Sequence, residues 1–307
     1  MGNKTKFTVL VTLMFLLPFL LLSRHFMAGE GELQKKDTLR YLELRTSAAA
    51  GIISDILNLD YSLNRVAASV SSGGISAVKK GLDAKVKDSP FIYSELALLE
   101  PSGKAAARYS AERSLRHPLD YRSSPVFAES KRTGAPAGAV EYGEYTPPAL
   151  VLAEPLTADG SRYFLAGRLS LAYMGELVRL MGRNSYGNFG LVDAGGRIIA
   201  DSMSMSIVNP GVKAPPAVLK LMEAADDDGS PTVSGEFPYR GGTLLVSVSA
   251  VPGSGWRVYE IMDAASVPAR GVSVWVWRVV LSGVALIILF GVFTGMLAAR
   301  WFQSGRD

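Results

Sequence analysis

The chain contains no cysteine and only two histidines, His25 and His117. The absence of cysteine excludes disulfide bridges, thiolate metal ligands and cysteine nucleophiles. Histidine carries out proton transfer or metal ligation in most hydrolases and metalloenzymes, so the sequence offers few residues for such chemistry. It also contains neither a Gly-x-Ser-x-Gly nor a His-Glu-x-x-His motif. We therefore expect a protein that is not an enzyme, without catalytic residues, metal or cofactor.

Clusters of positive charge are absent too. The chain has 32 lysines and arginines against 28 acidic residues, and the net charge of +4 is spread along its length. A surface that follows a phosphate backbone needs basic residues gathered on one face, so nucleic acid is not an expected partner. The apolar residues, 48% of the chain, are by contrast concentrated near the two ends. This distribution indicates a membrane protein.

The first apolar stretch covers residues 7–22, FTVLVTLMFLLPFLLL, and follows Lys4 and Lys6. It is either a cleaved signal peptide or an uncleaved membrane anchor. A cleavage site requires small residues, and Ala28 has the bulky Phe26 two positions before it. We therefore favour the anchor, although the stretch is short beside the about 17–25 apolar residues of a span. The two lysines place the N-terminus in the cytoplasm.

The second apolar stretch covers residues 279–299, VVLSGVALIILFGVFTGMLAA, and contains no charge. At about 1.5 Å per residue, such a helix matches a hydrocarbon core about 30 Å thick. Trp277 and Trp301 flank it, as expected of aromatic residues at the membrane interfaces. Arg278 can extend its charge to the outer interface, and Arg300 suits a cytoplasmic exit. The two stretches predict a multi-pass protein of the cell (inner) membrane with a large extracytoplasmic domain.

A long helix is expected directly after the first span. From Leu39 onward, apolar residues recur at alternating steps of three and four, the pattern of a helix with a narrow apolar seam. Gly73 and Gly74 are expected to end it. The seam consists of Leu39, Leu42, Ala49, Ile53, Ile56, Leu63, Ala67 and Val70. It either packs on the sheet of its own domain or forms a parallel dimer interface, in which the interspersed Thr46 and Asp60 set the register.

The rest of the central part shows strand patterns, and one of them occurs twice. Residues 97–104, ALLEPSGK, and residues 190–197, GLVDAGGR, both contain two apolar positions, an acid, a tight turn with glycine and a base. The repeat predicts two copies of one module, each with a hairpin, a proline-rich irregular stretch and further strands. The further strands are expected at 139–144, 149–154, 162–171, 232–239, 243–251 and 256–262, with a helix at 172–182 between the copies. These elements predict an α+β protein with two antiparallel sheets.

The order of these elements resembles that of double CACHE sensor domains, the PAS-like extracytoplasmic ligand-binding regions of bacterial transmembrane receptors. The resemblance covers about residues 30–265. It rests on LDYRSSPVFAESKRTG (119–134), FGLVDAGGRIIADS (189–202) and LLVSVSAVPGSGWRVYEIM (244–262). It implies that the membrane-distal module binds a small molecule and that the second span carries the signal inward.

Six parts are therefore expected along the chain. They are a cytoplasmic N-terminus with the first transmembrane helix (1–28), a stalk helix (29–74), a membrane-distal PAS-like module (75–175), a membrane-proximal one (176–271), the second transmembrane helix (272–299) and a short cytoplasmic tail (300–307). The tail is too short to fold as an output domain. We expect either a truncated receptor or a sensor that acts through a cytoplasmic or membrane signalling partner.

The resemblance also implies a ligand site in the membrane-distal module. In the amino-acid-binding members of this family, the first loop resembles the pattern Tyr-x4-Arg-x-Trp-Tyr. A Tyr-x-Asp pattern and a later Asp follow it in the chain. Arg122 matches the arginine that holds a carboxylate, whereas Arg168 stands where the last acid would pair with an ammonium group. The implied ligand-binding set is Tyr121, Arg122, Tyr142, Glu144, Tyr145 and Arg168. Because a positive group replaces a negative one, we expect an anionic ligand such as a carboxylate, and not an α-amino acid.

Alternatives remain for the site and for the function. The two arginines of the set are otherwise exposed surface residues, and the tyrosines half-buried strand aromatics. The expected function is a membrane-anchored sensor of a small ligand. The second candidate is an adaptor or structural protein whose outer domain binds a partner protein. Gly291 and Gly295, spaced for close helix contact in the lipid bilayer, favour a homodimer in either case.

Overall fold

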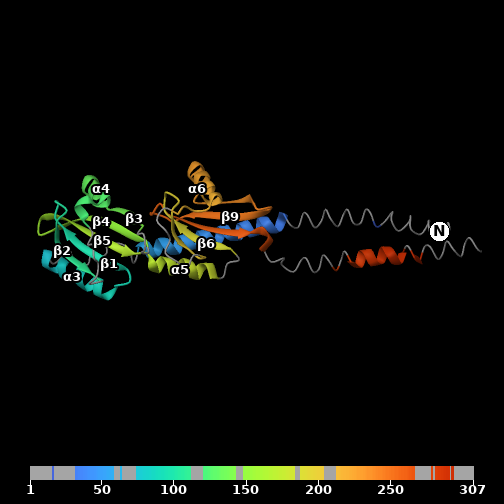
Figure 1. Cartoon of the computed structure of the whole chain (residues 1–307), viewed down its shortest axis with the longest axis horizontal. Helices are drawn as coiled ribbons and strands as arrows, with labels where there is room; N and C mark the ends of the chain where they lie inside the picture. Colours follow the sequence, from blue (N-terminus) through green and yellow to red (C-terminus); the bar gives the residue numbers. More distant parts are fainter. Residues whose placement is uncertain are drawn as a thin grey trace, which may run out of the picture. The chain divides into compact units, whose positions relative to one another are not determined.

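Two five-stranded antiparallel sheets form the central part of this α+β protein (Figure 1). The computed structural model describes residues 16, 32–58, 63, 74–111, 120–142, 148–183, 187–203, 212–266, 278, 281–290 and 292–293. Both sheets belong to one compact unit, Leu39–Asp263. The expected fold class, with an N-terminal helix and two antiparallel sheets, is confirmed.

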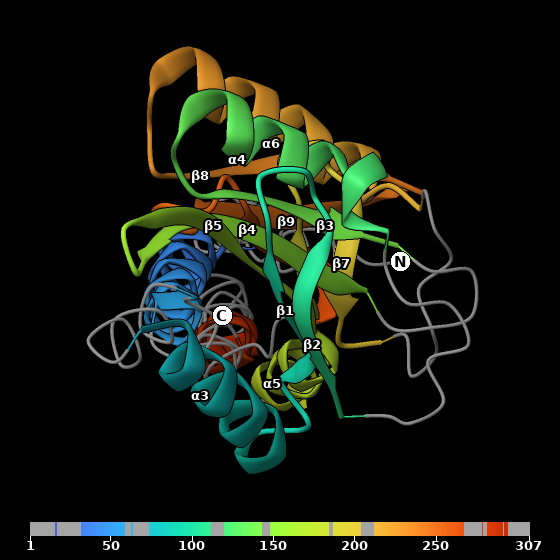
Figure 2. The same ribbon diagram turned by 90° about the vertical axis from the view of Figure 1, so that its left-hand side faces the viewer.

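The first module consists of one sheet with a helix on each face. Its elements are α3 (Gly74–Asp88), β1 (Tyr93–Leu99), β2 (Ala105–Ser110), the 3-10 helix η2 (Tyr121–Ser123), α4 (Pro125–Thr133), β3 (Ala137–Glu141), β4 (Ala149–Ala158) and β5 (Ser161–Ser170). The strand order is β2-β1-β5-β4-β3. α3 packs on β1 and β2, whereas α4 packs on β3 and β4 from the opposite face (Figure 2). Side chains that alternate along β1 therefore enter two different cores.

The second module repeats this arrangement. Its elements are α5 (Ala172–Arg183), β6 (Asn188–Val192), β7 (Ile198–Asp201), α6 (Pro216–Asp228), β8 (Thr232–Tyr239), β9 (Gly242–Ala250) and β10 (Arg257–Asp263), followed by the 3-10 helix η3 (Ala264–Ser266). The strand order β7-β6-β10-β9-β8 is the order of the first sheet. α5 packs on β6 and β7, and α6 on β8 and β9.

The two hairpins confirm the repeat seen in the sequence. The amide of Gly103 donates to the carbonyl of Glu100, and the amide of Gly196 donates to the carbonyl of Asp193. Both glycines have a positive φ, 82° and 72°, which side-chain-bearing residues rarely adopt. Both hairpins also shift register at the same point before the turn. The matching letters in the sequence thus correspond to matching backbone geometry.

Three helices differ from the sequence-based expectation. Gly74, expected to end the long helix, is the first residue of α3, and the stretches expected to be irregular contain α4 and α6. Proline discouraged a helix assignment, but in both it lies in the first helical turn, where no backbone N–H is needed. Gly134 and Gly229 end these helices in the left-handed conformation.

The N-terminal helix, residues 32–58, packs its apolar seam on its own protein. Leu42, Thr46 and Ile53 are fully buried. The hydroxyl of Thr46 lies 2.9 Å from the hydroxyl of Ser247 on β9. The interpretation of this seam as a dimer interface is therefore wrong for these residues, since the sheets of the same chain already occupy it. Asp60, the other proposed register residue, lies outside the described residues.

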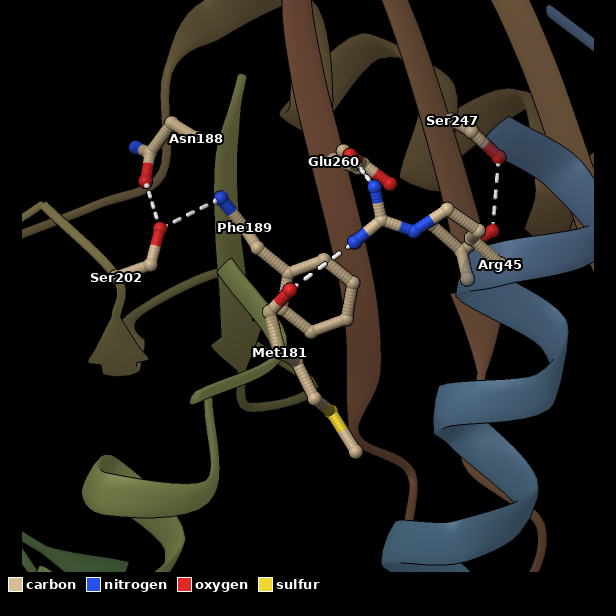
Figure 3. Close-up of polar contacts among 8 residues, drawn as sticks. Arg45, Met181, Asn188, Phe189, Ser202, Ser247 and Glu260 are labelled. Carbon is tan, nitrogen blue, oxygen red and sulfur yellow. Dashed lines mark hydrogen bonds and ion pairs between the residues drawn. The ribbon is translucent and has the colours of Figure 1, made fainter. Parts of the chain in front are cut away.

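Arg45 of the N-terminal helix joins two further elements of the second module (Figure 3). Its Nη1 donates to Oε1 of Glu260 on β10 at 2.9 Å, and its Nη2 donates to the carbonyl of Met181 in α5 at 3.0 Å. The Glu260 side chain is fully buried. Pairing in good geometry offsets much of the cost of burying a carboxylate. This contact therefore fixes the helix against the second sheet.

The expected membrane segments lie largely outside the described residues. Of the first stretch only residue 16 is described, and of the second only residues 281–290 and 292–293, all of them helical. Within the described ranges, no helix has both the length and the hydropathy that a bilayer crossing requires. The two spans stay predictions from the sequence.

Candidate ligand-binding site

Four strands of the first sheet bring charged side chains to the face that α4 covers. Glu95 on β1 lies opposite Arg168 on β5, and Arg108 on β2 lies opposite Ala97. Residues paired across strands point to the same face, as do alternate residues of one strand. Glu141, the last residue of β3, points to this face as well. It is four residues after Ala137, which packs against the apolar residues of α4, and alternate residues of a strand share a face. We call Glu95, Arg108, Glu141 and Arg168 the charged cluster.

The ion pairs within the charged cluster are loose. Nε of Arg108 lies 3.6 Å from Oε1 of Glu95, and Nε of Arg168 lies 3.8 Å from Oε2 of Glu141. Both distances exceed that of a hydrogen bond. The Arg108 guanidinium also lies 5.6 Å from the ring centre of Tyr121, within reach of a cation–π contact. An incoming anion could therefore take Arg168 from Glu141 without breaking a short ion pair.

Buried polar atoms without a hydrogen bond lie beside these pairs. Glu95 is 1% exposed, and its Oε1 accepts no hydrogen bond from the residues that the structure describes. The Ser124 hydroxyl, at the start of α4, also has no hydrogen bond with a described residue, whereas the Tyr121 hydroxyl lies close to the Glu95 carboxylate. Burial and then the charge of Glu95 raise the pKa of Tyr121 well above its ordinary value. Such orphaned groups are costly and are expected where a ligand supplies the missing partner.

Small residues form the floor beneath the charged side chains. Ala97, Ala153 and Ala166 are buried on the same face and pack with the residues of α4. Phe127 of α4 meets Phe164 of β5 edge to face, with the ring centres 5.2 Å apart. The helix is thus anchored at one end of the sheet by aromatic packing, while alanines line the part next to the charged cluster.

The residues implied by the resemblance do not all meet here. Arg168 belongs to the charged cluster and Tyr121 lies beside it. Arg122 lies outside it: its side chain is 69% exposed, pairs with Asp120 at 3.5 Å and covers the turn at Gly103.

The other three implied residues divide in a different way. The Tyr142 hydroxyl donates to Oδ2 of Asp193 in the second module at 2.9 Å. Burial, this hydrogen bond and the charge of Asp193 raise the pKa of Tyr142. Glu144 and Tyr145 lie outside the described residues. The sequence-based set therefore contributes two residues to the site that the described residues form.

Glu95, Arg108 and Glu141 were missed by the sequence reading. Glu95 could have been noticed in the sequence, because it is the one acidic residue in the mostly apolar strand Tyr93–Leu99. In a strand with both faces buried, a charged residue is unusual. Arg108 and Glu141 carried no such signal, since each lies near the end of a half-exposed strand. Only the pairing of the strands brings the three together.

The second module fills the equivalent position with its own side chain. Gly190 and Tyr259 are paired as Ala97 and Ala166 are in the first module. The Tyr259 ring lies so close to Gly190 that a Cβ there would approach it to 2.3 Å. Its hydroxyl donates to Oδ2 of Asp201 at 2.7 Å, and the residue is fully buried.

Three of the four charged-cluster positions are uncharged in the second module, and the fourth, Arg108, corresponds to the acidic Asp201. The strand register matches Glu95, Arg168 and Glu141 with Asn188, Ile261 and Phe237. Asn188 donates to Asp201 and accepts from Ser202, a contact that Figure 3 shows. In these described positions the polar groups are satisfied internally. The charged cluster is therefore a property of the first module alone.

Comparison with known proteins relates this chain to others by its fold. No protein-family model matches it, and no curated protein does. Among solved structures, one similar protein is the ligand-binding domain of the amino-acid chemoreceptor PctC of Pseudomonas aeruginosa PAO1 in complex with GABA. The TM-score is 0.54 and the identity 18%, over 74% of this chain and 100% of that one.

Two further structures show the same likeness. The ligand-binding domain of the Campylobacter jejuni chemoreceptor Tlp3 with L-norvaline has a TM-score of 0.56 and 15% identity, over 78% of this chain and 95% of that one. The ligand-binding domain of Mlp24 with asparagine has a TM-score of 0.52 and 14% identity, over 84% and 98%. The chain thus has the fold of chemoreceptor ligand-binding domains, and the resemblance to double CACHE sensor domains is confirmed at the level of the fold.

Proposed function

We propose that the protein is an extracytoplasmic sensor that binds a small ligand on the α4-covered face of its first sheet. The observation that carries this proposal is Oε1 of Glu95, a buried carboxylate oxygen without a hydrogen bond from any described residue. Two arginines lie next to it in loose ion pairs. A ligand that completes these contacts would stabilise the folded protein, because it binds only that state.

The charges define the ligand chemistry. Arg108 and Arg168 suit an acidic group, because a guanidinium binds a carboxylate with two parallel hydrogen bonds. Glu95 requires a hydrogen-bond donor on the same ligand. We therefore propose a small acid that also carries a hydroxyl or amino group, which readmits the α-amino acids that the sequence-based expectation left out. The named ligands of the similar structures, GABA, L-norvaline and asparagine, each contain an acidic group and a donor.

Signalling would proceed through the chain that follows the second sheet. β10 ends at Asp263, and the segment 272–299 is expected to cross the membrane. The proposed receptor is anchored in the inner membrane and passes a small displacement of its outer domain through that segment to a signalling partner. Pairing of two copies stays a prediction. The adaptor function is less favoured, because a protein that binds only another protein has no need of a buried carboxylate such as Glu95 beside two arginines.

A ligand panel tested by thermal unfolding of the full chain in detergent addresses the proposal. The panel contains hydroxy acids, dicarboxylates, amino acids and simple amines. Only acids that also carry a hydrogen-bond donor should raise the melting temperature of the protein. A ligand at a hundredfold excess over its Kd stabilises by about 2.7 kcal/mol. Binding of amines without an acidic group would contradict the assigned role of the arginines.

Three variants locate the site of any ligand found. Arg168→Gln and Glu95→Gln should each reduce the affinity at least about tenfold, because each removes one charge-assisted contact. Arg122→Gln is the matched control, since this arginine lies outside the charged cluster, and it should bind normally. The reverse pattern, with only Arg122→Gln impaired, would place the ligand at the η2 loop and refute the site.

A further inference from the structure

Tyr142 directly follows β3 of the first module and contacts the second module. Its hydroxyl donates to Oδ2 of Asp193 at 2.9 Å and to the carbonyl of Arg197 at 3.3 Å. The Arg197 guanidinium lies over the tyrosine ring, 4.7 Å from its centre. Asp193 is 7% exposed, so the carboxylate that Tyr142 meets is buried. One tyrosine therefore meets both charged groups of the β6–β7 hairpin.

Asp193 holds the turn of this hairpin together. Its Oδ1 accepts from the amides of Gly195 at 2.9 Å and Arg197 at 2.8 Å, and its Oδ2 accepts from Nε of Arg197 at 3.0 Å. The Tyr142 hydroxyl shares Oδ2 with the Arg197 side chain. A displacement of Tyr142 would therefore alter the hydrogen bonding of the carboxylate on which the turn depends.

The residue before Tyr142 belongs to the charged cluster. Glu141 lies 3.8 Å from Arg168, and neighbouring residues of an extended chain point in opposite directions. Within the described part of the first sheet, β3 is an edge strand that pairs only with β4. An edge strand is hydrogen-bonded to one neighbouring strand, whereas an inner strand is hydrogen-bonded to two, so an edge strand is displaced more easily. The end of β3 is thus joined to both the candidate site and the second module.

We propose that Tyr142 couples the occupancy of the charged cluster to the conformation of the second module. This inference rests on the proposed ligand site. An acidic ligand that takes Arg168 releases Glu141 and the end of β3, and Tyr142 transmits the shift to Asp193. β6 is paired with β10 along its length, and β10 leads to the expected second span. Tyr142 thereby acts as a positioning residue between the modules.

Amide hydrogen exchange of the full chain in detergent tests this without any ligand. Arg168→Gln removes the partner of Glu141 and imitates its release. The amides of Gly195 and Arg197, which bond to Asp193, should then exchange about three to ten times faster, the effect of weakening one hydrogen bond. Arg108→Gln is the matched control, because this cluster arginine forms its ion pair with Glu95 on β1 and lies on the edge strand opposite to β3.

The double variant decides whether Tyr142 is the link. Tyr142→Phe removes the hydroxyl and should itself speed exchange at the turn; in this background Arg168→Gln should add nothing. The proposal is overturned if Arg168→Gln leaves the exchange rates at the turn unchanged, or if Arg108→Gln raises them equally. It is also overturned if the effects of Tyr142→Phe and Arg168→Gln on these rates are independent, or if the amides of α6 exchange faster to the same degree. Because the exchange experiment uses no ligand, a negative result refutes the coupling through Tyr142 and leaves the proposed ligand site untouched. A negative ligand panel, in turn, does not change the exchange result.

Discussion

The two modules have the same strand order and the same turn geometry, but they use the α4- and α6-covered faces differently. In the first, alanines and a loosely paired charged cluster lie beneath the helix. In the second, the fully buried Tyr259 lies against Gly190 and bonds to Asp201. One backbone thus supports a candidate binding face in one copy and a closed core in the other. Side-chain size and charge make the difference.

The largest expected effect tests whether Tyr259 closes the second module. Tyr259→Ala should lower the free energy of unfolding by about 3–5 kcal/mol, the usual cost of truncating a buried aromatic residue. Because the lost group is a phenol, added phenol should recover part of the melting temperature, as small molecules fill cavities of their own shape. Tyr239→Ala, at a 49% exposed position of β8, is the control and should change little. An equal loss in both variants, or no rescue, would break the contrast.

A somewhat smaller effect is expected where the N-terminal helix meets the second sheet. Arg45→Met removes the ion pair that Arg45 makes with the buried carboxylate of Glu260 and should cost about 3 kcal/mol in urea unfolding. The double variant with Glu260→Met should recover most of that loss, because no unpaired charge remains. Arg168→Gln in the first module should cost less than about 1 kcal/mol, since its ion pair with the half-exposed Glu141 is loose. Comparable losses in the two modules would show that both pairs are structural.

The smallest effect concerns a buried acid on the other face of the first sheet. Burial raises the pKa of Glu154 on β4 from 4.5 to about 7. Below pH 4.5 the carboxyl is protonated in both the folded and the unfolded state. As the pH rises through about 7, the folded state must accept the buried charge, and about 1–3 kcal/mol of stability is lost.

Unfolding at several pH values measures this loss. Relative to the parent chain, Glu154→Gln should flatten the fall in stability between about pH 5 and pH 8. Glu223→Gln, at an exposed position of α6, should keep the fall. A parent chain whose stability rises over this range would show that Glu154 is paired in the folded state.

Much of the fold followed from local patterns. Runs of strand-forming residues bounded by turn residues predicted β8 at its observed bounds and the other strands within a few residues. The repeated ALLEPSGK and GLVDAGGR stretches indicated the two hairpins, since a glycine at positive φ is required at each turn. The helices α4 and α6 were missed because proline at their start was taken as a sign of irregular structure.

The site followed much less well. Arg168 was implied by the resemblance, but its neighbour Glu95 lies far from it in the sequence and comes close only through the pairing of β1 with β5. Arg122, in a loop that matches part of a known motif, lies outside the charged cluster. The buried seam of the N-terminal helix had the spacing of a dimer interface. Periodicity shows that a face is buried, and leaves its partner undetermined.

The sequence by itself determined the class of fold, the duplication and the two apolar ends, because local periodicity, turn chemistry and hydropathy act over a few residues. Only the tertiary structure decided which charges meet, which module is closed by Tyr259, and that Tyr142 reaches Asp193. These facts depend on strand register and on packing between segments distant in the chain. No local pattern encodes them, because a contact across a sheet is set by both strands together.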